Sequence, residues 1–512
     1  MTSPIAGTKT GWITAGLLLA ILMSSMDNTI VATAMGTIVG KLGGLDHFVW
    51  VTSAYIVTEM AGMPIFGKLS DMYGRKRLFT IGMIFFLVGS ALCGTAQSIV
   101  QLSLYRAVQG IGAGALVPIA FTILLDAVPP ENRGKLLALF GATYGISSLF
   151  GPLLGAFLTD TFSWRWIFFV NLPLGIAALF LTNRNYKESI NRSKQPIDWQ
   201  GTATLVGSVV CLVFALELGG KLFAWNSPII LGLLAGFAAL GGLFVLAERR
   251  ALEPIVSFSM FRDRIYASSA LIALLSGAAF IAATVYLPIY IQGVLGGSAT
   301  YSGFMLLPMM IGTVASAAIG GFVMDRTSYR SILVTTLALL VLGLGLLATI
   351  SPNSPPPLVT FYMIFVGIGI GASFSVLANA AIHSVSPANR GAATATINFL
   401  RAFGMMLGIT LFGILQNQLM NRKLSAIFQA NGDAVAAIPP GLNLTDPHAL
   451  MEPTARSAIP GGVLELLQNG VSASITEIFL WGLLPAVLAL AAAFAMGRAK
   501  HDPKAEADVY GH

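Results

Sequence analysis

The sequence predicts an all-α polytopic membrane protein with fourteen transmembrane helices. Of its 512 residues, 55% are hydrophobic and only 10% are charged, whereas about a quarter of the residues in a soluble domain are charged. Apolar runs of about 18 residues or more, long enough to cross a bilayer, recur along the whole chain. The first run, from Trp12, contains Asp27, lacks a clear small-residue cleavage site and leads into further spans. We therefore interpret it as a transmembrane helix and not as a cleaved signal peptide.

The spacing of the apolar runs and the distribution of cations predict the topology. The expected spans cover residues 13–36, 49–67, 78–96, 101–125, 135–158, 165–183, 200–218, 227–247, 266–291, 301–323, 331–350, 358–382, 392–417 and 475–497. Because the number is even, both ends of the chain are expected on one side. The loops of that side hold 21 of the 29 Lys and Arg residues, and those of the other side hold six. Positively charged loops face the cytoplasm, so both termini are predicted to be cytoplasmic, in a multi-pass plasma-membrane protein.

A repeated frame divides the chain into two halves. The pattern G-x-x-x-D followed by basic residues occurs at Gly67–Asp71 and again at Gly321–Asp325, eight predicted spans later. A duplication of six-helix halves gives an offset of six, so two further spans are expected between the halves. We predict a six-helix bundle at 1–183, a linker with two inserted helices at 184–265, a second six-helix bundle at 266–497 with an outer loop at 418–474, and a cytoplasmic tail at 498–512. Duplicated transporters place the substrate site between their halves.

Several motifs resemble those of the major facilitator superfamily. GKLSDMYGRKR at Gly67–Arg77 resembles its signature loop, and LSLYRAVQGIGAG at Leu102–Gly114 resembles its fourth-helix motif. GATYGISSLFGPLLGA at Gly141–Ala156 resembles the fifth-helix motif of the drug:proton antiporter branch, and MDNTIVATAM at Met26–Met35 resembles the first-helix motif of the fourteen-helix exporters. WRWIFFVNLPLG and IDWQG also resemble that branch. The resemblance covers spans one to thirteen. It implies a major facilitator fold of two six-helix bundles plus two inserted helices, and proton-coupled drug efflux as in bacterial multidrug exporters.

Three ionisable residues inside the predicted spans are candidates for proton coupling. Asp27 lies about 14 residues, on the order of 20 Å, into the first span. A carboxylate is disfavoured there, so Asp27 can take up and release a proton or pair with a cationic substrate; the alternative is an Asp that hydrogen-bonds to neighbouring helices for packing. Glu59, near the middle of the second span, is either a second proton or cation site or a neutral structural residue. Arg106 stays charged and needs a carboxylate, carbonyls or water. The resemblance implies that Arg106 helps proton coupling, with Asp27 as the candidate acid; the alternative is an arginine extending to the outer interface.

The predicted substrate contacts combine these acids with aromatic residues. Asp27 and Glu59 are expected to contact a cation. The further candidates for the cavity wall are Tyr55, Tyr144, Phe150, Tyr286, Tyr290 and Arg401. Aromatic rings and acids suit amphipathic cations, although ordinary core packing is the competing interpretation for each aromatic residue. Arg401 lies inside the thirteenth span, where it can line the cavity or bond to carbonyls.

Charged and glycine-rich segments point to moving parts. Asp71 and Arg75 can form a charge cluster that closes an inner gate when the halves rock together, while Gly67 permits close approach and Gly74 a tight turn. The fainter copy with Asp325 and Arg326 is expected to serve the second half. The fifth span carries close-packing glycines and a bending proline. These residues are Gly141, Gly145, Gly151, Pro152 and Gly155. The resemblance implies that this helix distinguishes exporters from importers.

The sequence disfavours several other functions. It contains no soluble ATPase domain, so transport is expected to use an ion gradient without a cofactor; protons are the default ion and sodium is the alternative. No H-E-x-x-H motif or Cys/His cluster is present, so neither a metal nor an intramembrane enzyme is expected. The net charge of +7 is spread over short turns and does not form a nucleic-acid site. The expected partners are amphipathic small molecules, protons and lipids, for a monomer. The alternative cargo is a lipid, an antibiotic or another metabolite.

Overall fold

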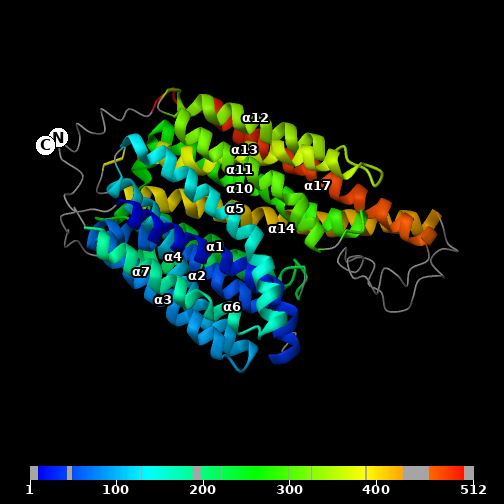
Figure 1. Cartoon of the computed structure of the whole chain (residues 1–512), viewed down its shortest axis with the longest axis horizontal. Helices are drawn as coiled ribbons and strands as arrows, with labels where there is room; N and C mark the ends of the chain where they lie inside the picture. The colour runs from blue at the N-terminus through cyan, green and yellow to red at the C-terminus, as the bar shows by residue number, and fades with distance from the viewer. Residues whose placement is uncertain are drawn as a thin grey trace.

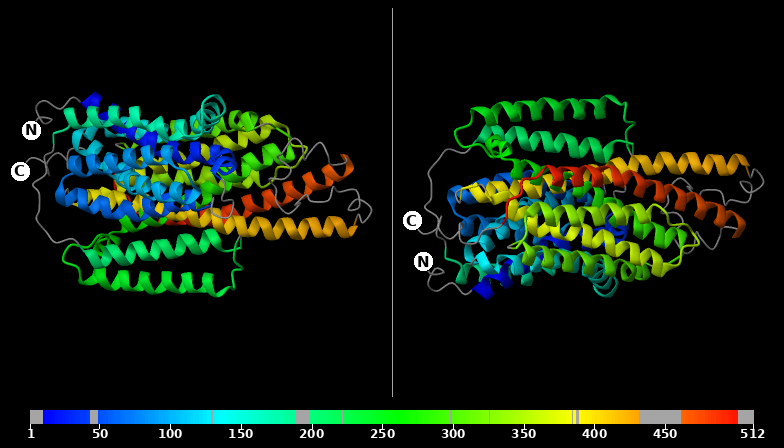
Figure 2. Two further views of the ribbon diagram at one scale, coloured as in Figure 1. Left: turned by 90° about the horizontal axis from the view of Figure 1, so that it is seen from below. Right: turned by 90° about the horizontal axis from the view of Figure 1, so that it is seen from above.

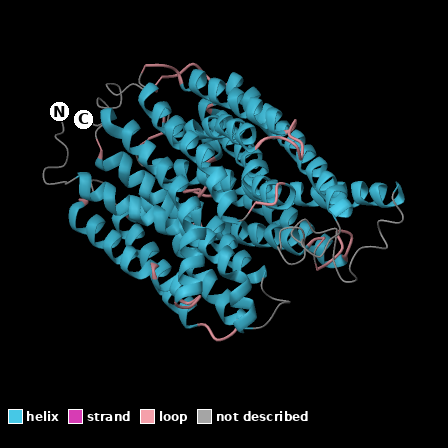
Figure 3. Cartoon of the chain, turned by 45° about the vertical axis from the view of Figure 1, so that its right-hand side comes forward, coloured by secondary structure: helices cyan, strands magenta, loops and turns pink. Residues whose placement is uncertain are grey.

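The described part of the chain is helical. The computed structural model describes residues 10–42, 49–128, 130–187, 198–220, 222–297, 299–324, 326–383, 385–386, 389–430 and 461–500. Within these ranges the regular structure is helical apart from two isolated β-bridges, and Figure 3 shows a bundle of helices joined by loops. The prediction of an all-α protein is confirmed.

The helices fall into three groups along the chain (Figure 1). The N-terminal half comprises α1 (Thr10–Leu42), α2 (Val49–Tyr73), α3 (Arg75–Thr95), α4 (Ile99–Ala127), α5 (Pro130–Thr161), α6 (Trp166–Phe169) and α7 (Asn171–Asn185). An inserted pair follows, α8 (Trp199–Leu218) and α9 (Pro228–Arg250). The C-terminal half comprises η2 (Phe258–Arg262), α10 (Arg264–Ile289), η3 (Tyr290–Val294), α11 (Ala299–Val323), α12 (Tyr329–Leu347), α13 (Pro356–Ile382), α14 (Arg390–Ala430) and α17 (Gly461–Ala495).

By length and composition, fewer of the described helices qualify as membrane spans than the fourteen that the sequence predicts. Among the described residues, twelve helical segments are long and apolar enough to cross a bilayer. Helices α2 and α5 are not among these twelve, although α2 packs against α4 and α5 packs against α1 inside the bundle. The number of fourteen therefore stays a prediction.

Polar residues and one glycine define where several helices begin. Side chains at the N-cap accept hydrogen bonds from backbone N–H groups of the first turn, which otherwise lack partners. These N-caps are Ser98, Asp198, Ser227, Asp263 and Ser328. Gly74 separates α2 from α3 with a φ of 103°, in the region that favours glycine. The charged turn therefore has the sharp reversal expected from its sequence.

Two helices extend beyond the rest of the bundle on one side (Figure 2). Helix α14 has 41 residues, a length of about 60 Å at 1.5 Å per residue, and α17 begins at Gly461. The described ends of the predicted loop at 418–474 are thus helical, which corrects that prediction; residues 431–460 lie outside the described part. The segment from Gly461 is helical because its apolar residues pack inward, with Leu467 only 1% exposed. Lys423 and Glu477 link the two helices at 3.2 Å.

The halves meet along two helix pairs, and the inserted pair covers one of them. Helix α2 packs against α14, and α5 packs against α11. Helices α8 and α9 form a hairpin at the side of the bundle in Figure 2, where α8 packs against α2. An apolar cluster joins α2, α8 and α14, with Val57, Val209 and Phe403 as members. The boundary between the halves therefore lies at the centre of the molecule.

Candidate functional site

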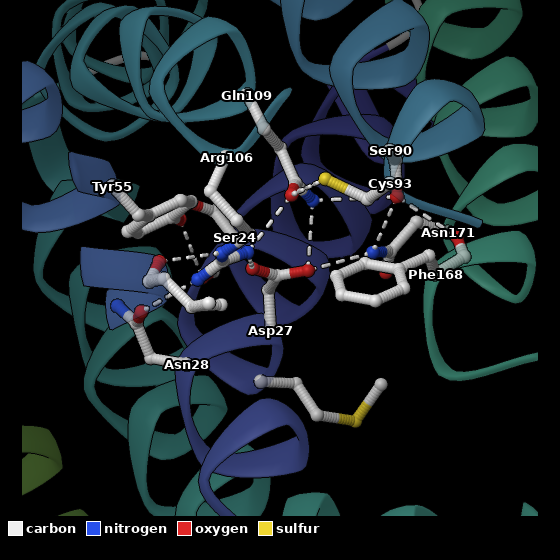
Figure 4. A network of polar contacts seen from close by, with 12 residues as sticks. Ser24, Asp27, Asn28, Tyr55, Ser90, Cys93, Arg106, Gln109, Phe168 and Asn171 are labelled. Atoms are coloured by element: carbon white, nitrogen blue, oxygen red, sulfur yellow. Dashed lines mark hydrogen bonds and ion pairs between the residues drawn. The ribbon is translucent and has the colours of Figure 1, made fainter. Parts of the chain in front are cut away.

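Asp27 and Arg106 form a buried ion pair within the N-terminal half (Figure 4). Asp27 lies on α1 and Arg106 on α4, and Nη1 of Arg106 donates to Oδ2 of Asp27. The exposed fractions of the two residues are 1% and 0%. The structure thus brings together two residues that the sequence could only propose as partners. The alternative of an arginine extending to the outer interface is wrong, because Arg106 is fully enclosed.

The second carboxylate oxygen of Asp27 accepts two amide hydrogen bonds. Gln109 on α4 donates through Nε2 at 2.8 Å, and Asn171 on α7 donates through Nδ2 at 2.9 Å. Ser90 on α3 accepts from both of these amides, at 3.3 and 3.1 Å. A buried carboxylate needs such donors because it has lost its water. Four helices therefore converge on one acid.

Arg106 connects this acid to the boundary between the halves. Its Nη2 donates to Oδ1 of Asn28 at 3.3 Å, and its guanidinium lies 4.0 Å from the centre of the Tyr55 ring. Asn28 and Glu59 also lie on the wall of one cavity, which is described next. A continuous set of contacts thus runs from Asp27 through Arg106 to Asn28, which shares a cavity wall with Glu59.

A cavity of about 510 Å³ lies between the two halves, within the size range of small-molecule sites. The wall from the N-terminal half is mainly polar and includes Ser24, Ser25, Asn28, Thr29, Glu59 and Ser147. The wall from the C-terminal half is mainly apolar and includes Phe280, Leu306, Met309, Met310, Phe374 and Met405, together with Asn398 and Arg401. The two walls therefore suit the polar and apolar ends of an amphipathic ligand.

Glu59 and Arg401 are the predicted substrate contacts that line this cavity. Asp27 is not on the wall, although its neighbour Asn28 is. Tyr55 is also absent from the wall, because its ring stacks on Arg106 and its residue is fully buried. Asp27 and Tyr55 thus lie behind the cavity wall, and each contacts Arg106; the prediction that they face the cavity is wrong.

Three of the other predicted aromatic contacts, Tyr286, Tyr290 and Phe150, do not line the cavity. Tyr286 and Tyr290 belong to the core of the C-terminal half, where the Tyr290 hydroxyl donates to the carbonyl of Ser351 at 2.6 Å. Phe150 is 55% exposed on the surface of α5. The side chain of Tyr144 lies outside the described residues. The apolar pattern of a span does not distinguish core, lipid-facing and cavity-facing aromatic residues, so these assignments failed.

Asp71 joins the two halves at the end of α2. Its Oδ1 accepts from the backbone N–H of Gly391 at 3.0 Å, and its Oδ2 accepts from that of Ala392 at 2.9 Å. These amides belong to the first turn of α14, where backbone N–H groups lack helical partners and the helix dipole favours a negative charge. The carboxylate of one half therefore caps a helix of the other.

Arg75 holds Asp71 in place. Its Nη2 lies 3.1 Å from Oδ1 of Asp71, and its Nη1 pairs with Asp126 at the end of α4. Arg75 and Asp71 are both buried, with exposed fractions of 1% and 5%. Because its guanidinium bridges Asp71 and Asp126, Arg75 on α3 links α2 to α4 next to the start of α14.

Gly67 lets α2 and α14 lie close together at this junction. A Cβ at Gly67 would lie 2.9 Å from the carbonyl oxygen of Gly391 and closer still to the Cβ of Ala395. Nearby, Lys68 pairs with Glu253 at 2.6 Å and donates to Asn389 at 3.4 Å. Glu253 follows α9, so Lys68 ties the linker to both halves.

We call this set of contacts the gate, after the role that the sequence predicts for it. It consists of Gly67, Lys68, Asp71, Arg75, Asp126, Glu253, Asn389, Gly391 and Ala392. Of the predicted second copy, Asp325 lies outside the described residues. Arg326 is exposed in the turn between α11 and α12, and its backbone N–H donates to the carbonyl of Val323 at 3.0 Å. Among the described residues, Asp71 of the first copy contacts the other half and Arg75 holds Asp71 in place, whereas Arg326 of the second copy lies at the surface.

The glycines of α5 bring that helix close to α1. A Cβ at Gly155 would lie 3.0 Å from the carbonyl oxygen of Ile30, and one at Gly151 would collide with the hydroxyl of Thr29. Pro152 lies between them inside α5. The surroundings of Gly141 and Gly145 lie outside the described part. Helix α5 thus packs in close contact with α1, the helix that carries Asp27.

Sequence reasoning missed several residues of these two sites. Gln109 lies three positions after Arg106 on α4, a spacing that places two side chains on one helix face and could have indicated it. Asn171, within the quoted WRWIFFVNLPLG, is a polar residue inside an apolar run and is fully buried. Asp126 lies directly after the predicted fourth span, and the sequence did not indicate a partner for its carboxylate. Gly391 gave no signal, because its role depends only on which helix begins beside Asp71.

Known proteins resemble this chain in sequence and fold. Residues 17–409 match the family described as Major Facilitator Superfamily. The chain is 49% identical over 506 residues to Multidrug resistance protein 3 of Bacillus subtilis, covering 99% of this chain and 98% of that protein. It is 33% identical to Multidrug transporter protein MdtP of the same organism, covering 93% and 91% of the two chains. The solved proton:xylose symporter XylE shares the fold, with a TM-score of 0.60 at 13% identity over 94% of each chain.

Proposed function

Because the chain belongs to the major facilitator superfamily, we propose that it exports amphipathic cations across the plasma membrane in exchange for protons. It is a membrane transporter related to multidrug efflux transporters, and not an enzyme. In this proposal it works as a monomer, needs no cofactor and draws its energy from the proton gradient.

The observation that carries the proposal is the buried pair of Asp27 and Arg106 beside the central cavity. In its ionised form, Asp27 balances the charge of Arg106. A proton on Asp27 removes that balance, because Arg106 keeps its charge. The guanidinium must then move toward other acceptors, of which Asn28 is the nearest on the cavity side. Proton binding is therefore linked to the arrangement of α1 and α4.

The surroundings of Asp27 favour protons over sodium as the coupling ion. A sodium ion needs several oxygen ligands, which transporters supply through carbonyls and carboxylates. Asp27 instead receives hydrogen bonds from a guanidinium and two amides. The fixed charge of Arg106 repels a metal cation at this place, whereas a proton can bind the carboxylate directly.

The cavity provides a place for the cationic substrate. Glu59 supplies a negative charge on the polar wall, and Met309, Met310 and Phe280 supply apolar surface opposite. Because Asn28 contacts Arg106 and lines the cavity together with Glu59, a cation at Glu59 and a proton at Asp27 add positive charge to neighbouring parts of the same half. Each disfavours binding of the other, and by thermodynamic reciprocity this is the requirement for exchange.

The gate supplies the alternating access. In the proposed orientation it lies at the cytoplasmic end, where Asp71 on the N-terminal half caps α14 on the C-terminal half. Opening toward the cytoplasm requires these bonds to break as the halves rock apart. Closing restores them and leaves the cavity accessible from the opposite side.

Uptake into inverted membrane vesicles tests the proposal. We expect the wild type to accumulate a fluorescent amphipathic cation only when a pH gradient is imposed. Asp27→Asn should abolish this uptake at unchanged expression, because the amide cannot bind the proton. Asp160→Asn makes the same chemical change at an exposed position of α5 and should leave uptake intact.

Three results would contradict all or part of the proposal. Gradient-driven uptake by Asp27→Asn at the wild-type rate would remove Asp27 from the coupling mechanism. Uptake that follows a sodium gradient and ignores the pH gradient would identify another ion. If the wild type moves no cation in a panel of amphipathic compounds but moves a lipid, an antibiotic or another metabolite, the cargo assignment is wrong while the transporter assignment remains.

A further inference from the structure

Asn171 carries a buried carbonyl oxygen that lacks a hydrogen-bond donor, directly beside Asp27. It is the first residue of α7, and its exposed fraction is 0%. Its Nδ2 donates to Oδ1 of Asp27 at 2.9 Å and to Oγ of Ser90 at 3.1 Å (Figure 4). Within the part of the chain that the structure describes, no group donates to its Oδ1. A buried polar atom without a partner is costly and calls for a physical reason.

A proton on Asp27 creates the donor that this oxygen lacks. An ionised carboxylate only accepts hydrogen bonds, whereas the neutral acid carries one O–H group that must find an acceptor. In the structure, Oδ2 of Asp27 is paired with Arg106, and Oδ1 receives the amides of Gln109 and Asn171. All of these groups are donors. Once protonated, the buried acid therefore faces donors on both oxygens, and one of them must be exchanged for an acceptor.

The other acceptors next to Asp27 are already in use. Oε1 of Gln109 accepts from Nη1 of Arg106 at 2.8 Å, and a guanidinium carries no acceptor of its own. Oγ of Ser90 accepts from the two amides at 3.3 and 3.1 Å. Of the side chains whose bonds to Asp27 the structure describes, Asn171 is therefore the one that has an acceptor to offer.

Three further titratable groups lie near the pair of Asp27 and Arg106, and each faces another partner. The ring of Tyr55 lies against the guanidinium, with 4.0 Å between its centre and the guanidinium carbon. The thiol of Cys93 donates to an amide oxygen of α4 at 3.7 Å. Glu59 lines the central cavity. These groups are thus turned to partners other than the carboxyl group of Asp27.

We propose that Asn171 is the positioning residue of the proton-loaded state, in which its side-chain carbonyl accepts the O–H group of Asp27. Half a turn about the Cβ–Cγ bond puts Oδ1 where Nδ2 now lies, at hydrogen-bond distance from the carboxyl group. The nitrogen then takes the unpaired place. Each orientation leaves one amide atom without a partner, and the proton on Asp27 decides which. The inference rests on the proposed function and specifies how the loaded proton is held.

The rotation extends the effect of the proton to further helices. Nδ2 of Asn171 leaves Oγ of Ser90 on α3, while α7 itself packs against α1, which carries Asp27. On the other oxygen of the acid, Arg106 links the same proton to α4. Protonation of one carboxyl group is thus linked to the positions of α3, α4 and α7 around α1.

Infrared difference spectroscopy in D₂O tests the proposal. Spectra of the purified wild type are recorded at low and at neutral pH, and subtraction of the same pair from Asp27→Asn isolates the O–D stretching band of protonated Asp27. This band falls in frequency when the group donates a hydrogen bond. We expect the wild-type band at the lowered frequency. Asn171→Leu keeps the approximate shape but removes the acceptor, and it should move the band to a higher frequency.

The control and the outcomes separate this inference from the proposed function. Asn183→Leu makes the same change further along α7, where the amide contacts Thr80, and should leave the band in place. An unchanged band in Asn171→Leu overturns the inference, because another group then accepts the proton. A wild-type band at the frequency of an unpaired acid overturns it as well. Wild-type spectra that match those of Asp27→Asn at both pH values contradict the proposed function itself, because Asp27 then binds no proton.

A second measurement needs no substitution at Asn171. Asparagine labelled with ¹³C at the side-chain carbonyl is incorporated into Asn28→Gln, which removes the asparagine that contacts Arg106. We expect one labelled carbonyl band to fall in frequency on acidification, because the Asn171 oxygen gains a donor. The band should stay in place when Asp27→Asn is added. Labelled bands that do not move on acidification overturn the inference.

Discussion

Asp71 and Gly391 lie in opposite halves of the chain, yet the Asp71 carboxylate accepts the backbone N–H of Gly391 at 3.0 Å. The same carboxylate accepts the next amide of α14, from Ala392. This contact closes one end of the boundary between the halves. In the proposed alternating-access cycle, this contact breaks when the cytoplasmic side opens and forms again when it closes.

Asp71→Ala is expected to loosen the gate. Loss of an acidic N-cap costs about 1 kcal/mol, so the open form should gain roughly fivefold in population relative to the closed form. Hydrogen exchange measures this directly, because the amides of Gly391 and Ala392 lose their acceptor. We expect faster exchange at these two amides and little change in the middle of α14. Unchanged exchange at Gly391 would show that Asp71 does not hold the gate closed.

Gly67→Ala is expected to prevent closure of the gate. The added methyl group meets the Gly391 carbonyl oxygen at 2.9 Å and comes closer still to Ala395. Ser70 is fully buried in the closed gate, so a cysteine at Ser70, in a background without Cys93 and Cys211, reports opening through labelling by a maleimide. We expect Gly67→Ala to raise the labelling rate and to reduce transport.

The matched control for this substitution lies on α14. Gly413→Ala adds the same methyl group where nothing lies within 4 Å, and it should change neither labelling nor transport. If Gly67→Ala labels as slowly as the control, the close approach seen here is not needed for closure.

The ion pair of Lys68 and Glu253 is expected to stabilise the closed gate by a small free energy. The side chains are 8% and 25% exposed, and exposure limits such a pair to about 0.5 to 1 kcal/mol. The effects of Lys68→Ala and Glu253→Ala on labelling at the same cysteine should therefore be less than additive in the double variant. Additive effects would mean that the linker after α9 moves independently of the gate.

Glu59→Gln is expected to narrow the range of exported cations more than it stops transport. The amide keeps the shape of the wall but removes its negative charge, so cations that depend on that charge lose affinity. A resistance and efflux panel of structurally different cations measures the range. Glu465→Gln, at an exposed position of α17, serves as the control. An unchanged range would reduce Glu59 to a structural residue.

The sequence predicts the helices well because each is an apolar run with clear polar ends. Its failures arise where the pattern is ambiguous. The sequence predicts that the amphipathic segment from Gly461 belongs to a loop, but the segment forms a helix whose apolar face packs inward. The length of α14 beyond residue 417 was missed for a similar reason, since polar residues continue the helix beyond the apolar run.

The candidate site is predictable only in part. Asp27, Arg106 and Asp71 stand out because charge inside or beside a span is rare and needs a physical reason. Their partners do not, since Asn171 and Gly391 lie far away in the sequence and carry no charge. The aromatic assignments at Tyr286, Tyr290 and Phe150 were wrong for the cavity, because hydrophobicity alone does not reveal which face of a helix meets an internal space.

Proton release on substrate binding tests the central claim most directly. Purified protein in weakly buffered detergent is mixed with an amphipathic cation, and the pH change is followed with a dye. If Asp27 exchanges its proton for substrate, the wild type should release about one proton for each cation bound. Asp27→Asn should bind the cation and release none. Equal proton release by the wild type and Asp27→Asn would contradict the account.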